Sequence, residues 1–434
     1  MPIQASLGAL SYPRVVSTPF PANTGFASIL STTTGTGIKS YSEADTTTPG
    51  GSVGADSAGN MYVAGSKPPV INTTDNAYVF KLDSTDGAGI FDQNYNPVLG
   101  YGATCDSNDI ATYTVSELSG GPGSATLYTT SARRLSGGSF VGITIINSGT
   151  PSSGTRAWVG NTRLGGDNRT CVAYSLESFG YIMGIAINNT TGAFTKRGLN
   201  PGGTGRTIDC VTDANGNFYL LGFAGTTAYL AKWNSAGTIQ WKLQGATSLG
   251  MNSIVADTSY LYVACNDGVI LKIDGSTGSI VLQYDFNGGN YITLGDDGYL
   301  YTSGNALSVM KLDTNLNAQW GWQASFGGDA NSGGATIGII QRGSHIYFGG
   351  GGTYNGRQAI FCIKTLTDGS IPQPGIWWVG TAYLRIFELI PNRTSSSKSL
   401  STSTVATGTS GSSSSTAFSG TPGSGGYVLG NTAF

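Results

Sequence analysis

The chain repeats a unit of about 40 residues, and this repeat constrains its fold more than any other feature. The unit is clearest at 252–286, where NSIVADTSYLYVACNDGVILKIDGSTGSIVLQYDF holds four short apolar runs with a turn signal after each of the first three. Its second run carries Tyr262 and its third run carries Lys272. The equivalent tyrosines are Tyr219, 43 residues earlier, and Tyr301, 39 residues later. Four strands in a unit of this length are typical of a β-propeller blade.

The number of copies sets the number of blades. Two further clear copies carry Tyr62 with Lys81 and Tyr347 with Lys364. The segment 95–205 contains weaker matches that fit two degenerate copies. Five clear and two degenerate copies predict an all-β fold, a β-propeller of seven four-stranded blades, although six or eight blades also fit the spacing.

The repeat divides the chain into three parts. Residues 51–375 are the predicted propeller, and residues 1–50 are an N-terminal arm or supply a strand that closes the ring. Residues 376–434 combine an apolar segment with a Ser/Thr/Gly-rich tail. A propeller needs at most one extra strand to close, so we expect one or both ends to extend as arms onto neighbouring molecules. The aromatic residues expected to make these assembly contacts are Trp377, Trp378, Tyr383, Phe387, Tyr427 and Phe434.

One lysine and one tryptophan position recur with the repeat. A catalytic lysine is needed once, so recurrence in every clear copy favours a structural role, with each ammonium meeting a neighbouring carboxylate or carbonyl. The tryptophans occupy equivalent places in the fourth run, where packing between blades is favoured over sugar binding. These structural repeat positions are Lys81, Lys232, Lys272, Lys311, Lys364, Trp241 and Trp320.

The residues that usually carry chemistry are sparse or poorly spaced. The single histidine, His345, lies in an apolar run, which argues against a catalytic triad or a metal cluster. The stretches at 213–217 and 313–317 echo calcium loops but lack the final glutamate, so turns are favoured. The glycines at 349–352 are not followed by the Lys-Ser/Thr of a phosphate loop. We therefore predict no catalytic residue, no metal, no cofactor and no enzyme activity.

Composition excludes several partners. Only 11% of residues are charged and the net charge is −2, so there is no electrostatic case for binding nucleic acid or anionic lipid. The N-terminal stretch lacks the pattern of a signal peptide, and no apolar run is long enough to span a membrane. The five cysteines are far apart and form no C-x-x-C pair. We expect buried free thiols in a protein made in a reducing cytoplasm.

Two resemblances extend this interpretation. Residues 213–245, DANGNFYLLGFAGTTAYLAKWNSAGTIQWKLQG, resemble the bacterial β-propeller repeat D-x-x-G-N-x-Y-x-x-G followed by A-x-x-x-K-x-[DN]-x-x-G and an apolar run with Trp. Residues 271–283 are similar to quinoprotein-type propeller repeats, with Leu282 where those have tryptophan. The resemblance covers about five of the seven predicted blades and implies a fold without implying an activity. The opening MPIQASLGALSYPRV resembles tail or capsid proteins of tailed phages.

Two classes of function remain open. The phage resemblance and the composition predict a non-enzymatic structural or interaction protein of the virion, in a tail, a fibre or a capsid decoration. Its expected partners are other virion proteins and copies of itself, with a host-surface glycan as a further candidate. The alternative is a secreted quinoprotein-like propeller enzyme or adhesin, which requires an export signal, a charged cluster in the central channel and a cofactor.

Overall fold

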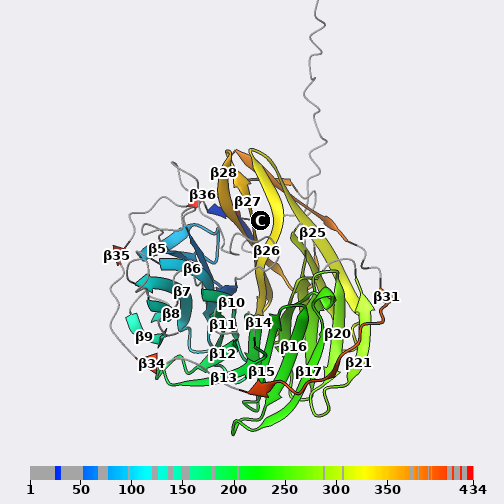
Figure 1. Ribbon diagram of the computed structural model, residues 1–434. Helices are drawn as coiled ribbons and strands as arrows, with labels where there is room; N and C mark the ends of the chain where they lie inside the picture. Colours follow the sequence, from blue (N-terminus) through cyan, green and yellow to red (C-terminus); the bar gives the residue numbers. More distant parts are fainter. Residues whose placement is uncertain are drawn as a thin grey trace, which may run out of the picture.

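The computed structural model is a closed ring of antiparallel sheets (Figure 1). It describes residues 25–30, 52–66, 77–95, 98–119, 126–134, 140–147, 157–176, 181–202, 205–286, 289–304, 307–370, 376–379, 381–389, 391, 393–407, 413–414, 421–422 and 428–433. Among these residues the chain forms seven sheets, and the predicted all-β propeller is confirmed.

The first four sheets follow the order of the chain, with four consecutive strands in each. Blade 1 contains β2 (Val53–Ala55), β3 (Met61–Ser66), β4 (Ala77–Leu82) and β5 (Gly89–Tyr95). Blade 2 contains β6 (Val98–Cys105), β7 (Ala111–Ser119), β8 (Thr126–Arg134) and β9 (Phe140–Asn147). Blade 3 contains β10 (Ala157–Leu164), β11 (Thr170–Leu176), β12 (Ile182–Ile187) and β13 (Phe194–Asn200). Blade 4 contains β14 (Gly205–Thr212), β15 (Phe218–Ala224), β16 (Thr227–Trp233) and β17 (Ile239–Ala246).

The remaining three sheets complete the ring. Blade 5 contains β18 (Met251–Ala256), β19 (Tyr260–Cys265), β20 (Val269–Asp274) and β21 (Ile280–Asp285). Blade 6 contains β22 (Tyr291–Leu294), β23 (Leu300–Ser303), β24 (Ser308–Leu312) and β25 (Ala318–Gly328). Blade 7 contains β26 (Ala330–Arg342), β27 (His345–Tyr354), β28 (Arg357–Leu366) and, from the other end of the chain, β1 (Phe26–Leu30).

The first strands of neighbouring blades contact one another around the centre. Contacts run from β2 to β6, β10, β14, β18, β22 and β26, and β26 returns to β2. Each sheet is thus packed between two neighbours, which explains why its strands are apolar on both faces. The cluster between blades 4 and 5, for example, joins Tyr219 and Leu230 to Ile254 and Leu271, all fully buried.

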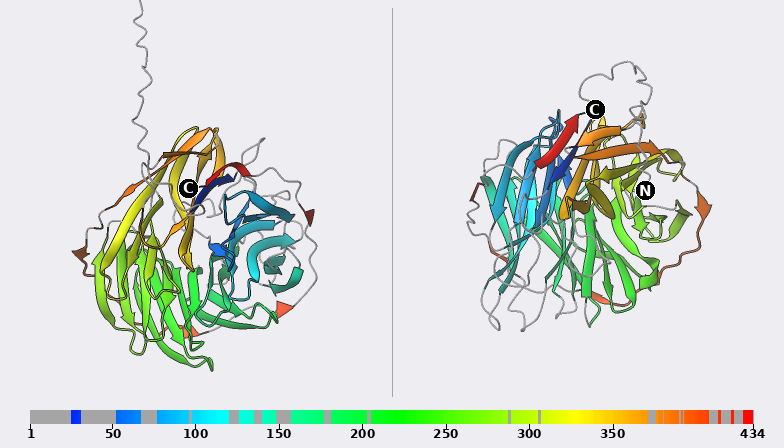
Figure 2. Two further views of the ribbon diagram at one scale, coloured as in Figure 1. Left: turned by 180° about the vertical axis from the view of Figure 1, so that it is seen from behind. Right: turned by 90° about the horizontal axis from the view of Figure 1, so that it is seen from above.

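The N-terminal strand β1 closes the ring. It pairs with β28 from Phe26 opposite Lys364 to Leu30 opposite Ile360, and all five of its residues are fully buried. Blade 7 is therefore assembled from residues that lie more than 300 positions apart in the chain. In Figure 2 the blue strand β1 lies beside the red strand β36 (Val428–Ala433), which pairs with its outer edge.

The C-terminal segment forms a belt around the outside of the ring (Figures 1 and 2). It adds a strand to every blade, in the reverse order of the chain, from blade 6 back to blade 1 and then blade 7. We call these strands the belt: β29 (Ile376–Val379), β30 (Ala382–Glu388), β31 (Thr394–Ser395), β32 (Ser401–Thr402), β33 (Ala406–Thr407), β34 (Ser413–Ser414), β35 (Thr421–Pro422) and β36.

The course of the belt differs from the expectation that the C-terminal segment leaves the ring. Where the structure describes it, this segment pairs with the fourth strands of its own blades, for example Ser401 with Gln244 of β17. The fourth strand of a blade has an outer edge of unpaired N–H and C=O groups. Small Ser, Thr and Ala residues can pair with that edge through the backbone alone. Among the described residues, no helix is long and apolar enough to cross a membrane.

Candidate functional site

The recurring lysine makes polar contacts that join one blade to the next, and we call each such set of contacts a tie. In blade 4, Lys232 Nζ is 5.3 Å from the centre of the Tyr219 ring and donates to the Gly275 carbonyl of blade 5 at 2.7 Å. Trp241 Nε1 donates to the same carbonyl at 3.0 Å. The Tyr219 hydroxyl donates to Asp213 in the turn before its own strand, at 3.3 Å. One carbonyl of blade 5 is thus held by two donors of blade 4.

The other recurring lysines make related contacts. Lys311 and Trp320 of blade 6 repeat the double contact, donating to the Thr367 carbonyl of blade 7 at 3.4 and 3.2 Å. Lys364 of blade 7 donates to the Ser84 carbonyl of blade 1 at 2.6 Å. The two remaining pairs are Lys272 with Asn315 Oδ1 of blade 6 at 3.4 Å, and Lys81 with Asp56 of its own blade at 3.2 Å.

The ties shift the pKa values of the groups inside them. Burial, followed by the charge of the neighbouring aspartate, raises the pKa of the hydroxyls of Tyr62 and Tyr219 well above its usual range. Burial opposes ionisation of Asp56, but hydrogen bonds from Asn60 and Tyr62 and the charge of Lys81 outweigh it and hold its pKa below the usual value. Neutral tyrosines and ionised aspartates stabilise a rigid contact between strands.

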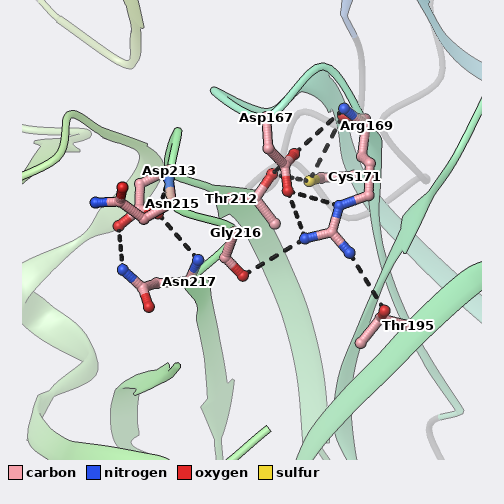
Figure 3. Close-up of polar contacts among 9 residues, drawn as sticks. All are labelled: Asp167, Arg169, Cys171, Thr195, Thr212, Asp213, Asn215, Gly216 and Asn217. Atoms are coloured by element: carbon pink, nitrogen blue, oxygen red, sulfur yellow. Dashed lines mark hydrogen bonds and ion pairs between the residues drawn. The ribbon is translucent and has the colours of Figure 1, made fainter. Parts of the chain in front are cut away.

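Blade 3 has a different tie, shown in Figure 3. Cys171 lies where the clear copies have tyrosine, and Arg169 provides the positive charge. Arg169 Nη2 is 2.5 Å from Asp167 Oδ2 and donates to the Gly216 carbonyl of blade 4 at 3.5 Å. Thr212 of blade 4 donates to the other oxygen of Asp167 at 2.5 Å. The contact between blades is retained although the residues that make it have changed.

A buried ion pair lies at the central channel. Arg163 of β10 reaches Asp209 of blade 4 at 2.7 Å, and Asp209 is fully buried. Its guanidinium also donates to Ser253 Oγ at 2.7 Å and to the carbonyls of Ile254 at 2.5 Å and Ile292 at 3.0 Å. One side chain therefore connects the first strands of blades 3, 4, 5 and 6. Burial raises the pKa of Asp209, and the charge of Arg163 opposes that rise.

A cavity of about 370 Å³ occupies the channel beside this pair. Residues of the first strand of every blade line it, including Arg163, Arg342 of β26 and the buried Thr104 and Thr162. The hydroxyls of these two threonines have no hydrogen-bond partner among the described residues. The cavity can therefore hold water or a small polar molecule.

The predicted assembly residues are partly gathered on the belt hairpin β29–β30 of blade 6. Trp378 is 66% exposed and Phe387 is 45% exposed. The Trp378 ring lies edge-on to Tyr383 at 5.9 Å, and the Arg385 guanidinium lies 5.1 Å from the centre of the Tyr383 ring. We call Trp378, Tyr383, Arg385 and Phe387 the rim patch. The backbone of Trp377 belongs to β29, whereas Tyr427 and Phe434 lie outside the described residues.

The remaining candidates are scattered. His345 Nδ1 lies 3.1 Å from Ser344 Oγ at the start of β27, and the five cysteines are buried free thiols. Within the described ranges, no group of three or more His, Cys, Asp and Glu side chains is placed to hold a metal ion. Sequence reasoning missed the Arg163–Asp209 pair. The signal was a charged residue inside an apolar first run, in the segments NTRLGG and TIDCVTD.

Comparisons with known proteins give only distant structural similarities. No family model and no curated protein matches the chain. The WD40 β-propeller domain of Doa1 is similar in structure, with 13% identity and a TM-score of 0.47 over 78% of this chain and 97% of that one. BamB from Moraxella catarrhalis has 13% identity and a TM-score of 0.35 over 77% of this chain and 92% of that one. The fold is established by this chain's own ring of sheets.

Proposed function

We propose that this chain is a non-enzymatic structural and interaction protein of a phage particle. The observation that carries the proposal is the belt, which adds a strand to each of the seven described sheets and places β36 beside β1 in blade 7. A ring whose outer edges are covered and whose blades are tied by repeated polar contacts is a rigid platform. The resemblance of the N-terminal residues to phage tail and capsid proteins supports the location.

The rim patch is the surface that we assign to partner proteins in the particle. It exposes tryptophan, arginine and phenylalanine beside a half-buried tyrosine, and these residue types are enriched in protein interfaces. Tyr383, Arg385 and Phe387 lie on β30, which is paired on both sides, and Trp378 lies on the neighbouring strand β29, so the patch is presented on one sheet. A host-surface glycan is a second ligand compatible with exposed aromatic rings.

The proposal is tested by mass spectrometry of purified virions, with the copy number measured against the major capsid protein. A small multiple of three or six per particle would place the chain in a fibre or collar, and hundreds of copies would place it on the capsid. If the chain is made in infected cells but is absent from purified virions, the proposal is wrong.

The role of the rim patch is tested in the same particles with Trp378→Ala. We expect this variant to be incorporated at least tenfold less than the wild type, because an exposed aromatic anchor is lost. Val281→Ala is the matched control, since Val281 is an apolar residue, 48% exposed, on β21 of blade 5. Equal incorporation of both variants would show that the rim patch does not contribute to the interface.

A further inference from the structure

The outermost strand of blade 7 covers the strand that closes the ring. β36 pairs with β1 from Phe26 opposite Ala433 to Leu30 opposite Val428, with a register shift at Ile29. The other edge of β1 pairs with β28. All five residues of β1 are fully buried, so the edge that β36 covers belongs to a core strand. If β36 left, β1 would present a row of unpaired N–H and C=O groups to any extended strand.

The belt strands that lead to β36 are paired over much shorter lengths. β33 pairs with β13 through Ala406 and Thr407, and both residues are exposed. β34 pairs with β9 at two positions, and β35 pairs with β5 at two positions. One residue of β35 is Pro422, which has no N–H to donate. Short pairings of this kind open more readily than a five-position pairing against a buried strand.

Every copy of the chain carries both the strand β36 and its acceptor edge on β1. Exchange of β36 between two copies therefore replaces each contact with an identical contact, which is the condition for a low-cost strand swap. Twenty residues separate Thr407 from Val428, and a chain of that length spans up to about 66 Å when extended. This length allows β36 to reach a second ring that lies against the first.

We propose that β36 is an exchangeable donor strand that pairs with β1 of a second copy of this chain. Two copies that exchange strands reciprocally form a closed dimer, and copies that each pass the strand to the next form a head-to-tail series. The inference deepens the proposed function, because it names the partner and the contact through which copies join in the particle.

Engineered disulfides test the exchange with the full-length chain. Ser28 pairs directly with Asn431, and Ala27 with Thr432. All variants with Ser28→Cys also carry Cys362→Ala, because Cys362 lies directly opposite Ser28 on β28 and would compete for the disulfide. The single variants Ser28→Cys and Asn431→Cys are mixed at high concentration, oxidised gently and separated on a non-reducing gel. We expect a covalent dimer in the mixture at least tenfold above either variant alone. The matched control mixes Asn431→Cys with Val281→Cys, an exposed position outside blade 7, and should give no such dimer.

The double variant Ser28→Cys/Asn431→Cys, repeated as Ala27→Cys/Thr432→Cys, reports the intramolecular pair. It should close its own disulfide, lose the ability to form multimers and regain that ability with a reductant. A double variant that closes while the mixed single variants give no dimer above the control would overturn the proposal. Failure of both double variants to close would also overturn it, because β36 would then not lie on β1.

Particle experiments separate this inference from the proposed function. If the locked double variant enters virions as well as the wild type, strand exchange is wrong and the virion role stands. If the wild type is absent from virions while the mixed variants form the covalent dimer in solution, the virion role is wrong and the exchange stands.

Discussion

Replacing Arg163 by methionine should be among the most destabilising single changes in this chain. The substitution keeps an unbranched side chain of similar length and removes the positive charge beside Asp209, which is fully buried. Loss of one partner of a buried ion pair costs about 3–5 kcal/mol, because the remaining charge is left without compensation. The lost donors to Ser253, Ile254 and Ile292 belong to the same network and are included in that range.

The reverse change should cost less. Asp209→Asn leaves Arg163 charged, but Arg163 lines the channel cavity and its side chain is 13% exposed, so water can solvate it. We expect a loss of about 1–3 kcal/mol, in the range of one hydrogen bond to a charged group. The double variant Arg163→Met/Asp209→Leu removes both charges and should be more stable than the sum of the two single losses predicts.

The assay is unfolding in guanidinium chloride at pH 7, followed by tryptophan fluorescence and far-UV circular dichroism. The midpoints and slopes are compared for the wild type, the two single variants and the double variant.

Burial raises the pKa of Asp209, and removal of Arg163 removes the charge that opposes the rise. A raised carboxyl pKa gives a stabilisation that is present at low pH and is lost as the pH increases. The deficit of Arg163→Met should therefore shrink as the pH is lowered towards 4. A deficit below about 1 kcal/mol at pH 7, or single losses that simply add, would refute the reasoning.

Three further predictions concern the ties and the belt. Lys232→Met should lower the free energy of unfolding by about 1.5–3 kcal/mol, because its ammonium no longer donates to the Gly275 carbonyl. Gln240→Met, which removes an exposed contact with the Thr238 carbonyl in the same blade, should lower it by no more than about 0.5 kcal/mol, and equal losses in a denaturant titration would contradict this. Asp56→Asn should reduce the loss of stability in acid, because the pKa of Asp56 is held below its usual value. The stabilisation from Asp56 is present above about pH 4 and is lost as the pH falls, so the melting temperature of the wild type should approach that of the variant at low pH. Deleting residues 390–434 should leave a folded ring, as measured by circular dichroism. Trypsin should cleave the deletion variant at least tenfold faster, because β1 and the outer edges of the blades are no longer covered. Unchanged cleavage would argue that the belt contributes no protection.

The parts of the fold that could be predicted are those in which side chains repeat. Tyr219, Tyr262 and Tyr301 carry the period because each must fill the same place between two blades and reach an aspartate in the preceding turn. The sequence of blade 3 does not show this tyrosine period, because Cys171 replaces the tyrosine and Arg169 makes the contact with the next blade. A search for one residue type therefore missed a contact that different residues preserve.

The belt and the channel pair could not be predicted for a different reason. The belt pairs through its backbone, so Ser401, Thr402 and their neighbours need no apolar alternation, and the segment resembles an unstructured tail. The Arg163–Asp209 pair joins two copies of the repeat, and its two residues occupy different positions within the first strands. No period marks it, and only the closed ring brings the two side chains together.

Blade 7 is where these features meet. Its sheet combines residues 330–366 with β1 from the start of the chain and β36 from the end. β1 cannot pair until β28 exists, and β36 cannot pair until β1 is in place, so this sheet requires the longest loop closures in the molecule. The sheet of blade 7 is therefore complete only after the last residues have arrived, and loss of β36 exposes the edge of β1, a strand that no short turn joins to its neighbour β28. If β36 of another copy pairs with the exposed edge of β1, the two propellers are connected while every other blade stays closed.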